Sequence, residues 1–466
     1  MLVTRLWVAL SNKKYVCITA VICTLLLYAC TSSTSNTTPT LPQHPTYAQD
    51  IAPILIKNCV PCHKKNGAGP FELLNYTQVL KHAKMIREVT RSRYMPPWPA
   101  DATYSQFLDQ KVLSQYDIDV ISKWVEQGKL MGDTQLIATA KNTATKAPQP
   151  DMVLRMKAPY KIMGTNMDSF LIMKFPFEIP QKKYVRYIEF VPDNKRIVHH
   201  VNTNLVSYFP PMHNSKLMQG HYYGNILSGS KQQVYERLNI PNDDGTYPQL
   251  QISVCNYLPG MEAYKFPDGI GGYVFQKQGM LLIDELHYGP SLKDTTDNSY
   301  FNVYFMPNAP VRPTQEITLG TNGKSPVVPP LVILPNTVST HTTQIKVNED
   351  VSLLNLNPHM HLLGKRFMAY AITPAGDTIP LIKINKWDFR WQYVYTFNHM
   401  LKIPKGSTIY AHGTFDNTVY NALNPFYPPR VVGERNGSMR TTDEMFQLII
   451  MYLPYQQGDE NISLKP

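Results

Sequence analysis

Short apolar runs separated by turn-forming residues dominate the chain after residue 155, and they constrain its fold more than any other feature. The runs are rich in Val, Ile, Tyr and Phe, and Pro, Gly or Asn separates one from the next. Short strands that alternate with turns in this way are typical of antiparallel β-sandwiches. A Pro content of 38 in 466 residues also favours loop-rich β structure over helical bundles. The clearest runs are Phe170–Phe177, Tyr184–Val191, Ile197–Val206, Met280–His287, Phe301–Phe305, Val351–Asn357, Thr408–Phe415 and Phe446–Leu453.

This β-rich part is long enough for two domains, since a domain typically has roughly 100–200 residues. A Pro-rich stretch at residues 325–335 marks the expected boundary. We therefore expect one antiparallel, jelly-roll-like β-sandwich over residues 155–325 and a second over residues 326–466.

Residues 46–135 show the pattern of short helices instead. Apolar residues recur at helical spacing within residues 47–58 and again within residues 79–89. Ser114 and Asp117 have the spacing of a capping box, which starts a third helix. We predict a small all-α domain here. The segments expected to be linkers are residues 31–45 and 136–154.

The helical segment contains a Cys-x-x-Cys-His motif at Cys59, Cys62 and His63. Two thiols at this spacing reach both vinyl groups of a porphyrin while the adjacent imidazole reaches the iron, so the motif indicates covalent haem c. Met95 precedes two prolines and a tryptophan, and we predict that its thioether is the sixth ligand, as in cytochromes c. The competing ligands are His82 and Met85.

Residues 1–30 have the layout of a bacterial lipoprotein signal peptide: basic residues, a short apolar core and then Cys30. Cleavage there makes Cys30 the lipid-bearing first residue of a protein facing the periplasm. The alternative is an N-terminal anchor that is not cleaved, which also places the rest of the chain outside the cytoplasm.

The formal net charge of +11 is spread along the chain without a run of Lys or Arg. A diffuse excess of this kind does not form a nucleic-acid-binding stripe, so we expect no nucleic-acid partner.

Five of the 13 histidines are grouped. His199 and His200 are adjacent, His287 ends an apolar run, and His359 and His361 are two residues apart. Residues two apart point to one face of a strand, so His359 and His361 are able to hold one ion. Adjacent histidines face opposite ways in an ideal strand, so His199 and His200 share a metal only at a strand end or a distortion. Taken singly, each of these histidines is more typical of an ordinary core or surface residue than of a metal ligand, and His-x-His by itself is a weak signal.

The region from residue 151 onwards resembles the copper type II, ascorbate-dependent monooxygenases, the family of peptidylglycine hydroxylase and dopamine β-monooxygenase. The matching motifs follow in order: His199-His200 in a Val-His-His strand, His287 before Tyr-Gly, His359-x-His361 before Leu-x-Gly, and Thr442–Met445 before an apolar strand.

The resemblance implies two β-sandwich domains that face each other across a solvent-filled cleft and hold one copper each. It implies dioxygen activation at the methionine-containing site and hydroxylation of a substrate C–H bond, with the second electron from the all-histidine site. Soft thioether sulfur favours Cu(I), which is the state that meets dioxygen. The implied ligands are His199, His200 and His287 for one copper and His359, His361 and Met445 for the other.

Three positions differ from the peptide hydroxylase. The arginine that grips its substrate's carboxylate corresponds to Asn357, and two further substrate-side residues correspond to Gln447 and Ile449. A peptide carboxylate would lack a charged partner here, which disfavours peptidylglycine as substrate. The disulfides of that family are also missing from this sequence. Cys255 is predicted to be a buried residue that packs like a small apolar side chain.

Together these features predict an exported, lipid-anchored dicopper monooxygenase that uses dioxygen, an unidentified substrate and an upstream electron donor, with electrons relayed through haem c. One alternative is a haem- and copper-binding electron-transfer protein without hydroxylase activity. The other is a structural double sandwich whose histidines bind no metal.

Overall fold

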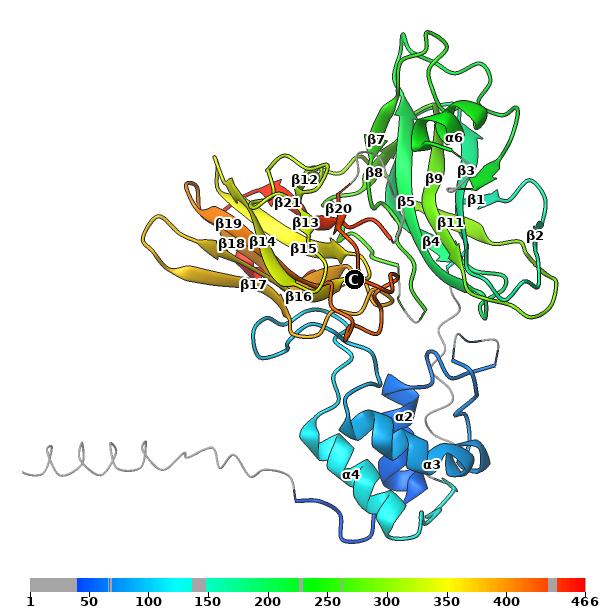
Figure 1. Ribbon diagram of the computed structural model, residues 1–466, viewed down its shortest axis with the longest axis vertical. Coiled ribbons are helices and arrows are strands. Elements are labelled where there is room, and N and C mark those ends of the chain that lie inside the picture. The colour runs from blue at the N-terminus through cyan, green and yellow to red at the C-terminus, as the bar shows by residue number, and fades with distance from the viewer. Residues whose placement is uncertain are drawn as a thin grey trace, which may run out of the picture. The chain divides into compact units, whose positions relative to one another are not determined.

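A computed structural model describes residues 40–465, except residues 66, 68, 136–147, 226–228, 260, 262 and 435–441 (Figure 1). The chain divides into two compact units, Met1–His44 and Pro45–Pro466. The predicted signal segment and Cys30 lie outside the described residues. No helix in the described part is long and apolar enough to span a membrane.

The N-terminal part of the second unit is helical, as the periodicity predicted. Ser114 and Asp117 form a reciprocal capping box at the start of the last helix, which satisfies N–H groups of its first turn. Fully buried Ile51, Ile121 and Trp124 belong to one apolar cluster that joins the helices. The elements are η1 (Tyr47–Ile51), α2 (Ala52–Asn58), α3 (Tyr76–Arg91) and α4 (Gln115–Glu126).

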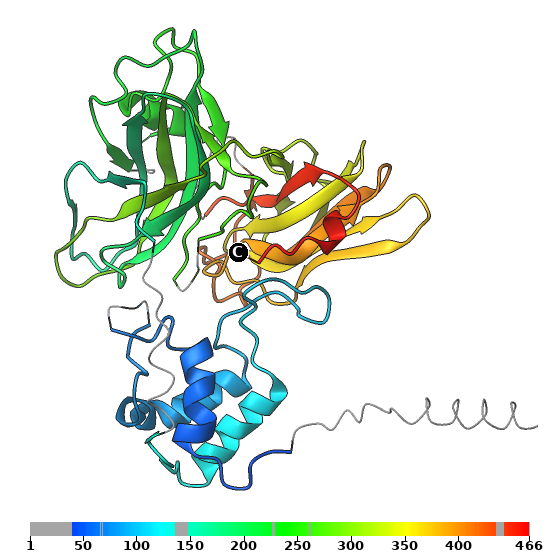
Figure 2. The ribbon, with the colours of Figure 1, turned by 180° about the vertical axis from the view of Figure 1, so that it is seen from behind.

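Two sheets build the first sandwich (Figure 2). One contains β6 (Tyr223–Asn225), β3 (Ser169–Glu178), β9 (Gln278–Tyr288), β5 (Val198–Tyr208) and β7 (Gln249–Gln251), in that order. The other contains β1 (Met152–Arg155), β11 (Tyr300–Phe305), β4 (Lys183–Val191) and β8 (Tyr273–Phe275). A separate pair is formed by β2 (Tyr160–Ile162) and β10 (Thr295–Asp297).

The core of this sandwich lies between the sheets, where Phe175 of β3 meets Phe301 of β11 edge to face with ring centroids 4.9 Å apart. Strand β9 is buried at ten successive positions. Its second face contributes Met280 and Leu282 to another apolar cluster, together with Val234 of α6 (Lys231–Arg237). A strand covered on both faces typically has a continuous apolar run. Met280–Ile283 form such a run in β9, whereas Asp284, Glu285 and His287 are buried polar residues further along it.

The second sandwich, like the first, has two antiparallel sheets, and here each sheet has four strands. One contains β12 (Gln315–Gly320), β21 (Phe446–Pro454), β15 (Val351–Met360) and β18 (Tyr395–Ile403), in that order. The other contains β14 (Val338–Lys346), β19 (Thr408–Asp416), β16 (Gly364–Ile372) and β17 (Thr378–Ile384). The short β13 (Val332–Ile333) and β20 (Val432–Gly433) pair separately, and η3 (Asp459–Asn461) follows β21.

The β-rich class predicted for this part of the chain is confirmed, and each of the eight apolar runs coincides with a strand. The domain boundary differs from the expected one. Strand β12 pairs with β21 along its whole length, so the second sandwich begins before Gln315 and not at residue 326. Strand β1 likewise extends the first sandwich back to Met152, inside the segment expected to be a linker.

Candidate metal centres

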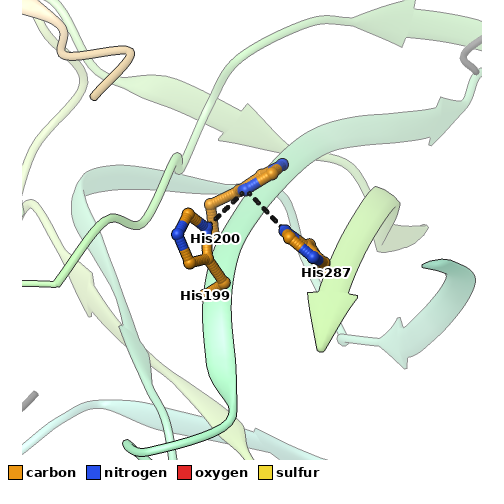
Figure 3. Close-up of side chains that lie close together, drawn as sticks. All are labelled: His199, His200 and His287. Carbon is orange, nitrogen blue, oxygen red and sulfur yellow. Dashed lines mark hydrogen bonds between the residues drawn. The ribbon is translucent and has the colours of Figure 1, made fainter. Parts of the chain in front are cut away.

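The first candidate centre joins His199 and His200 of β5 to His287 of β9 (Figure 3). The Nδ1 atom of His200 lies 3.1 Å from Nδ1 of His199 and 3.4 Å from Nδ1 of His287. One ligand atom from each residue lies within 4.8 Å of the others. Three imidazole nitrogens that converge in this way suit a copper or zinc ion.

A bulge explains how two adjacent histidines reach one point. The pairing of β5 with β9 shifts between Val198 and His200, and His200 then pairs directly with His287. A bulge turns the side chain of the extra residue away from strict alternation. The distortion required by the sequence is therefore present.

Two carboxylates hold the outer nitrogens of this set. His287 Nε2 lies 2.6 Å from Asp168 Oδ1. His200 Nε2 lies 3.4 Å from Oε1 of Glu285, which is fully buried, and the two atoms are not aligned for a hydrogen bond. Carboxylates in such outer positions orient metal-bound imidazoles and fix their tautomers. The sequence motifs identified neither acid.

His199 and His287 favour the neutral form that binds metals. Burial, followed by the neighbouring imidazoles, lowers the pKa of His199 to about 3. Burial also lowers the pKa of His287, against the effect of Asp168. Burial raises the pKa of Glu285, but the adjoining imidazoles outweigh it and bring this pKa down to about 2. The buried acid is therefore an anion beside the set.

The second candidate centre lies where β15 and β21 meet. His359 Nε2 and His361 Nε2 are 3.1 Å apart. Met360 pairs with Phe446 in the antiparallel register, so Met445, one residue before, stands opposite His361. His359, His361 and Met445 are all buried. Burial, followed by the charge of His361, lowers the pKa of His359 to about 3.

The backbone around Met445 fixes this set. His361 Nδ1 lies 2.7 Å from the carbonyl oxygen of Asp443. Since a carbonyl only accepts, Nδ1 carries the proton and Nε2 keeps its lone pair for a ligand. The buried Glu444 carboxyl accepts hydrogen bonds from the backbone N–H groups of His361, Leu363 and Met445. These bonds tie the methionine segment to the histidine strand.

Phe389 lies between the two histidine sets. Its ring is edge-to-face with His200 at a centroid distance of 5.6 Å and with His361 at 5.7 Å. Its side chain is buried. The resemblance implied a solvent-filled cleft between the copper sites, whereas here an aromatic side chain contacts a ligand candidate on each side.

The Cys-x-x-Cys-His motif forms a turn directly after α2. Cys59 and Cys62 are free thiols, and the N–H of His63 donates to the carbonyl of Cys59 at 2.9 Å. His63 Nδ1 lies 2.9 Å from the carbonyl oxygen of Phe71, which leaves Nε2 as the ligand atom. A Cβ at Gly69 would lie 2.7 Å from His63 Nδ1. The thiols, the fixed tautomer and this close glycine fit a covalently held haem.

The three candidates for the sixth haem ligand differ in position. Met85 is 52% exposed on α3. His82 stacks on Phe71 at 3.8 Å, and Phe71 packs against His63, so His82 lies beside the residue that supports His63. Met95 is half-buried, and its N–H donates to the Val89 carbonyl. Met95 stays our prediction.

A cavity of about 360 Å³ is lined in part by residues of β15 and β21, the two strands whose ends meet at the second histidine set. Asn357 and Ile449, which pair across β15 and β21, both line it. The sequence resemblance assigned both residues to substrate-contacting positions. The third such residue, Gln447, instead donates to the Thr321 carbonyl. Cys255 lines the cavity too; it is buried, and burial raises its pKa to about 12, as expected for an unreactive thiol.

Residues 317–462 match the family model of the copper type II ascorbate-dependent monooxygenases, C-terminal domain. The match contains His359, His361 and Met445 and runs from β12 to η3. It supports a copper-dependent monooxygenase, and hence an oxidoreductase, and the histidine cluster of the first sandwich adds a second possible metal site.

No curated protein matches the chain. Among solved structures, those of the infectious bursal disease virus Gx and Gt strains are 11% identical, cover 69% of this chain and 78% and 77% of theirs, and have TM-scores of 0.16 and 0.17. The T13 particle of the same virus is 10% identical, covers 67% of this chain and 77% of its own, and has a TM-score of 0.15. At such TM-scores these similarities support no conclusion.

Proposed function

We propose that the chain is an exported dicopper monooxygenase whose helical domain binds haem c and relays electrons to the copper sites. The proposal is supported by the segment that matches the monooxygenase family, in which His359 Nε2 and His361 Nε2 are 3.1 Å apart and the strand register places Met445 opposite His361. The convergent histidines of the first sandwich supply the second copper site.

The donor atoms agree with copper at both sites. Three imidazoles suit either oxidation state of copper, and the thioether of Met445 favours Cu(I). Copper bound at the second set supplies dioxygen activation. The protein's part is to keep the imidazoles neutral by burial, to orient them through Asp168, Glu285 and the Asp443 carbonyl, and to exclude water with Phe389.

The cavity is the proposed substrate site. On strand β15, His359 follows Asn357 by two residues, a step of roughly 6.7 Å along the same face. A substrate against Asn357 and Ile449 is therefore next to the metal ligands. The walls are mainly apolar, and burial raises the pKa of the one glutamate there, Glu316, to about 8. Lys57, Lys111 and Lys265 also line the cavity, so the walls favour a mostly apolar molecule and do not exclude one that carries an acidic group.

Copper analysis of the full-length protein tests the metal assignment. Wild-type protein is expected to bind two copper ions per chain with a type II cupric EPR signal, and His359→Ala is expected to bind one. A copper content that is unchanged by this substitution contradicts the site. Absence of copper from both proteins favours the structural double sandwich.

The second candidate is an electron-transfer protein without hydroxylase activity, and Asn357 at the place of the substrate-gripping arginine favours it. Incubation of the reduced protein with ¹⁸O₂ and a cell-envelope extract separates the two functions. A product that gains one ¹⁸O atom supports hydroxylation. Oxygen consumption that never labels a product supports electron transfer alone.

Attachment to the membrane through Cys30 is also part of the proposal, on the strength of the signal pattern in residues 1–30. Labelling with a palmitate analogue in a bacterial host tests it. Wild-type protein should carry the label in the membrane fraction, and Cys30→Ala should not. A labelled Cys30→Ala protein contradicts the assignment.

A further inference from the structure

Four aromatic residues alternate along the segment that joins β17 to β18. They are Phe389, Trp391, Tyr393 and Tyr395 in residues 388–395, which we name the aromatic segment. It spans the distance between the histidine sets and the helical domain. Contacts at each end show what it connects.

The first end touches both histidine sets. The buried ring of Phe389 packs edge-to-face on His200 and His361, at interplanar angles of 86° and 85°. Beside it, Arg390 forms two hydrogen bonds with Asp388, of 2.6 and 2.9 Å. This ion pair holds the turn that presents Phe389.

The other end packs on the helical domain. The Trp98 ring lies 5.5 Å from Tyr393 and 5.3 Å from Tyr395. The Tyr393 hydroxyl donates to the Pro97 carbonyl at 3.1 Å. The N–H of Leu108 donates to the Thr396 carbonyl at 2.7 Å. These contacts fix the chain that follows Met95 against the segment.

The haem motif lies near the same tyrosine. Pro61 and Tyr393 line one cavity. Burial raises the pKa of Tyr393, so its ring lies in the apolar interior beside this cavity. Within the segment, Trp391 and Tyr393 stack at 6.3 Å and 10°. Aromatic contacts and covalent bonds thus lead from the motif to Phe389.

We propose that the aromatic segment carries single electrons from the haem domain to the copper sites, with Tyr393 next to the donor and Phe389 next to the acceptor. This inference rests on the proposed function. One electron leaves the ferrous haem, which becomes ferric, and reduces Cu(II) to Cu(I) at the all-histidine set. No proton or atom is transferred, and an external reductant restores the ferrous haem.

A second route starts at Tyr257, the sequence neighbour of Asn256, which lines the same cavity as Pro61. Its backbone forms hydrogen bonds of 3.0 and 2.9 Å with Val201, the neighbour of His200. That route reaches one histidine set through the backbone alone. The aromatic segment reaches both sets through side chains, which is why it is the one we propose.

The test follows haem oxidation directly, without substrate. Full-length protein with ferric haem and Cu(II) receives one electron at the haem by flash photolysis, and the absorbance of ferrous haem and the cupric EPR signal are followed under anaerobic conditions. We expect the ferrous haem to decay as the cupric signal falls. We expect Tyr393→Leu and Phe389→Leu each to slow this decay by at least about 10-fold.

Three variants control the result. Tyr393→Phe keeps the ring and should transfer at the wild-type rate. Tyr410→Leu removes a tyrosine that stacks on Tyr370 in β16 and β19 and should also leave the rate unchanged. Haem potential and copper content should be equal in all proteins. Phe389→Leu acts at the end remote from the helical domain, so slowing in both leucine variants does not arise from lost docking.

Wild-type rates in both leucine variants overturn the role of the aromatic segment while leaving the proposed function intact. Slowing by Tyr257→Leu but not by Tyr393→Leu overturns it in favour of the backbone route. Ferrous haem that persists in the wild-type protein contradicts both the relay and the proposed function.

Discussion

Asp168 and Glu285 lie next to the outer ring nitrogens of His287 and His200 in the all-histidine set, which leaves the inner nitrogens to bind a metal. Asp168 lies 119 positions from His287 in the sequence, and Glu285 is 85 positions from His200. Nothing in the local pattern marks either residue, because such contacts depend on which strands and loops become neighbours. The ligand histidines were recognisable from motifs, whereas their orienting partners and Phe389 required the fold.

Loss of Asp168 should weaken copper binding at the all-histidine set. In Asp168→Ala the His287 ring loses the acceptor of its Nε2–H, so Nδ1 is no longer held toward the centre. We expect the affinity of this site to fall by about 10–100-fold. Titration with a competing copper chelator, followed by EPR, measures it.

Asp168→Asn should recover part of this loss, because the amide oxygen still accepts the hydrogen bond. Asp294→Ala removes an exposed acid paired with Lys161 and serves as the matched control. Equal affinities in Asp168→Ala and wild type would show that the acid does not orient the ring.

Met445→Ile separates the two oxidation states of the second copper. Two imidazoles remain to bind Cu(II), so the cupric EPR signal should persist. The soft ligand for Cu(I) is lost, and dioxygen-dependent product formation should fall by roughly 100-fold or more. Met400→Ile, at a buried methionine of β18, should leave product formation unchanged. Persistent oxygenase activity in Met445→Ile would remove Met445 from the site.

At the scale of elements, hydrophobic patterning identified the strands well. The alternation along β19 and the apolar run Met280–Ile283 of β9 both agree with the burial of those strands. The bulge at Val198–His200 was not readable, because a register shift depends on the partner strand. That shift is what lets two adjacent histidines converge.

The turn after α2 depends on a glycine. In Gly69→Ala the added methyl would lie within 3.0 Å of three ring atoms of His63, so the ring must move and lose its bond to the Phe71 carbonyl. We expect most molecules to lose the low-spin haem spectrum and the covalent haem content to fall. Lys65→Ala, at an exposed position of the same turn, should retain both. Normal spectra in Gly69→Ala would contradict the assigned ligand geometry.

At the scale of the whole molecule, the cavity is a shared feature of all three structured parts. Pro61 comes from the helical part, Cys255 from the first sandwich and Ile449 from the second. Sequence analysis predicted the three parts and their order, but no motif indicated that their surfaces enclose one space. The placement of Glu316 inside that space has a consequence for stability.

Glu316 should make the folded protein lose stability as the pH rises from about 4.5 to 8. Burial raises its pKa from 4.5 to about 8, so across this window the folded chain keeps a proton that the unfolded chain has lost. Fewer protons on the unfolded state mean that the free energy of unfolding falls with rising pH, by up to about 1.4 kcal/mol per pH unit from this group. Glu316→Gln removes this contribution while keeping a neutral side chain.

The difference in Tm between Glu316→Gln and wild type should therefore be small near pH 4.5 and should grow in favour of the variant up to pH 8. Above pH 8 this residue should not increase the difference further. Calorimetry at steps of one pH unit measures it. Glu236→Gln, at an exposed glutamate of α6, should follow the wild-type curve throughout. Parallel Tm curves for Glu316→Gln and wild type would show that the Glu316 carboxyl is ionised in the cavity, and would contradict the raised pKa.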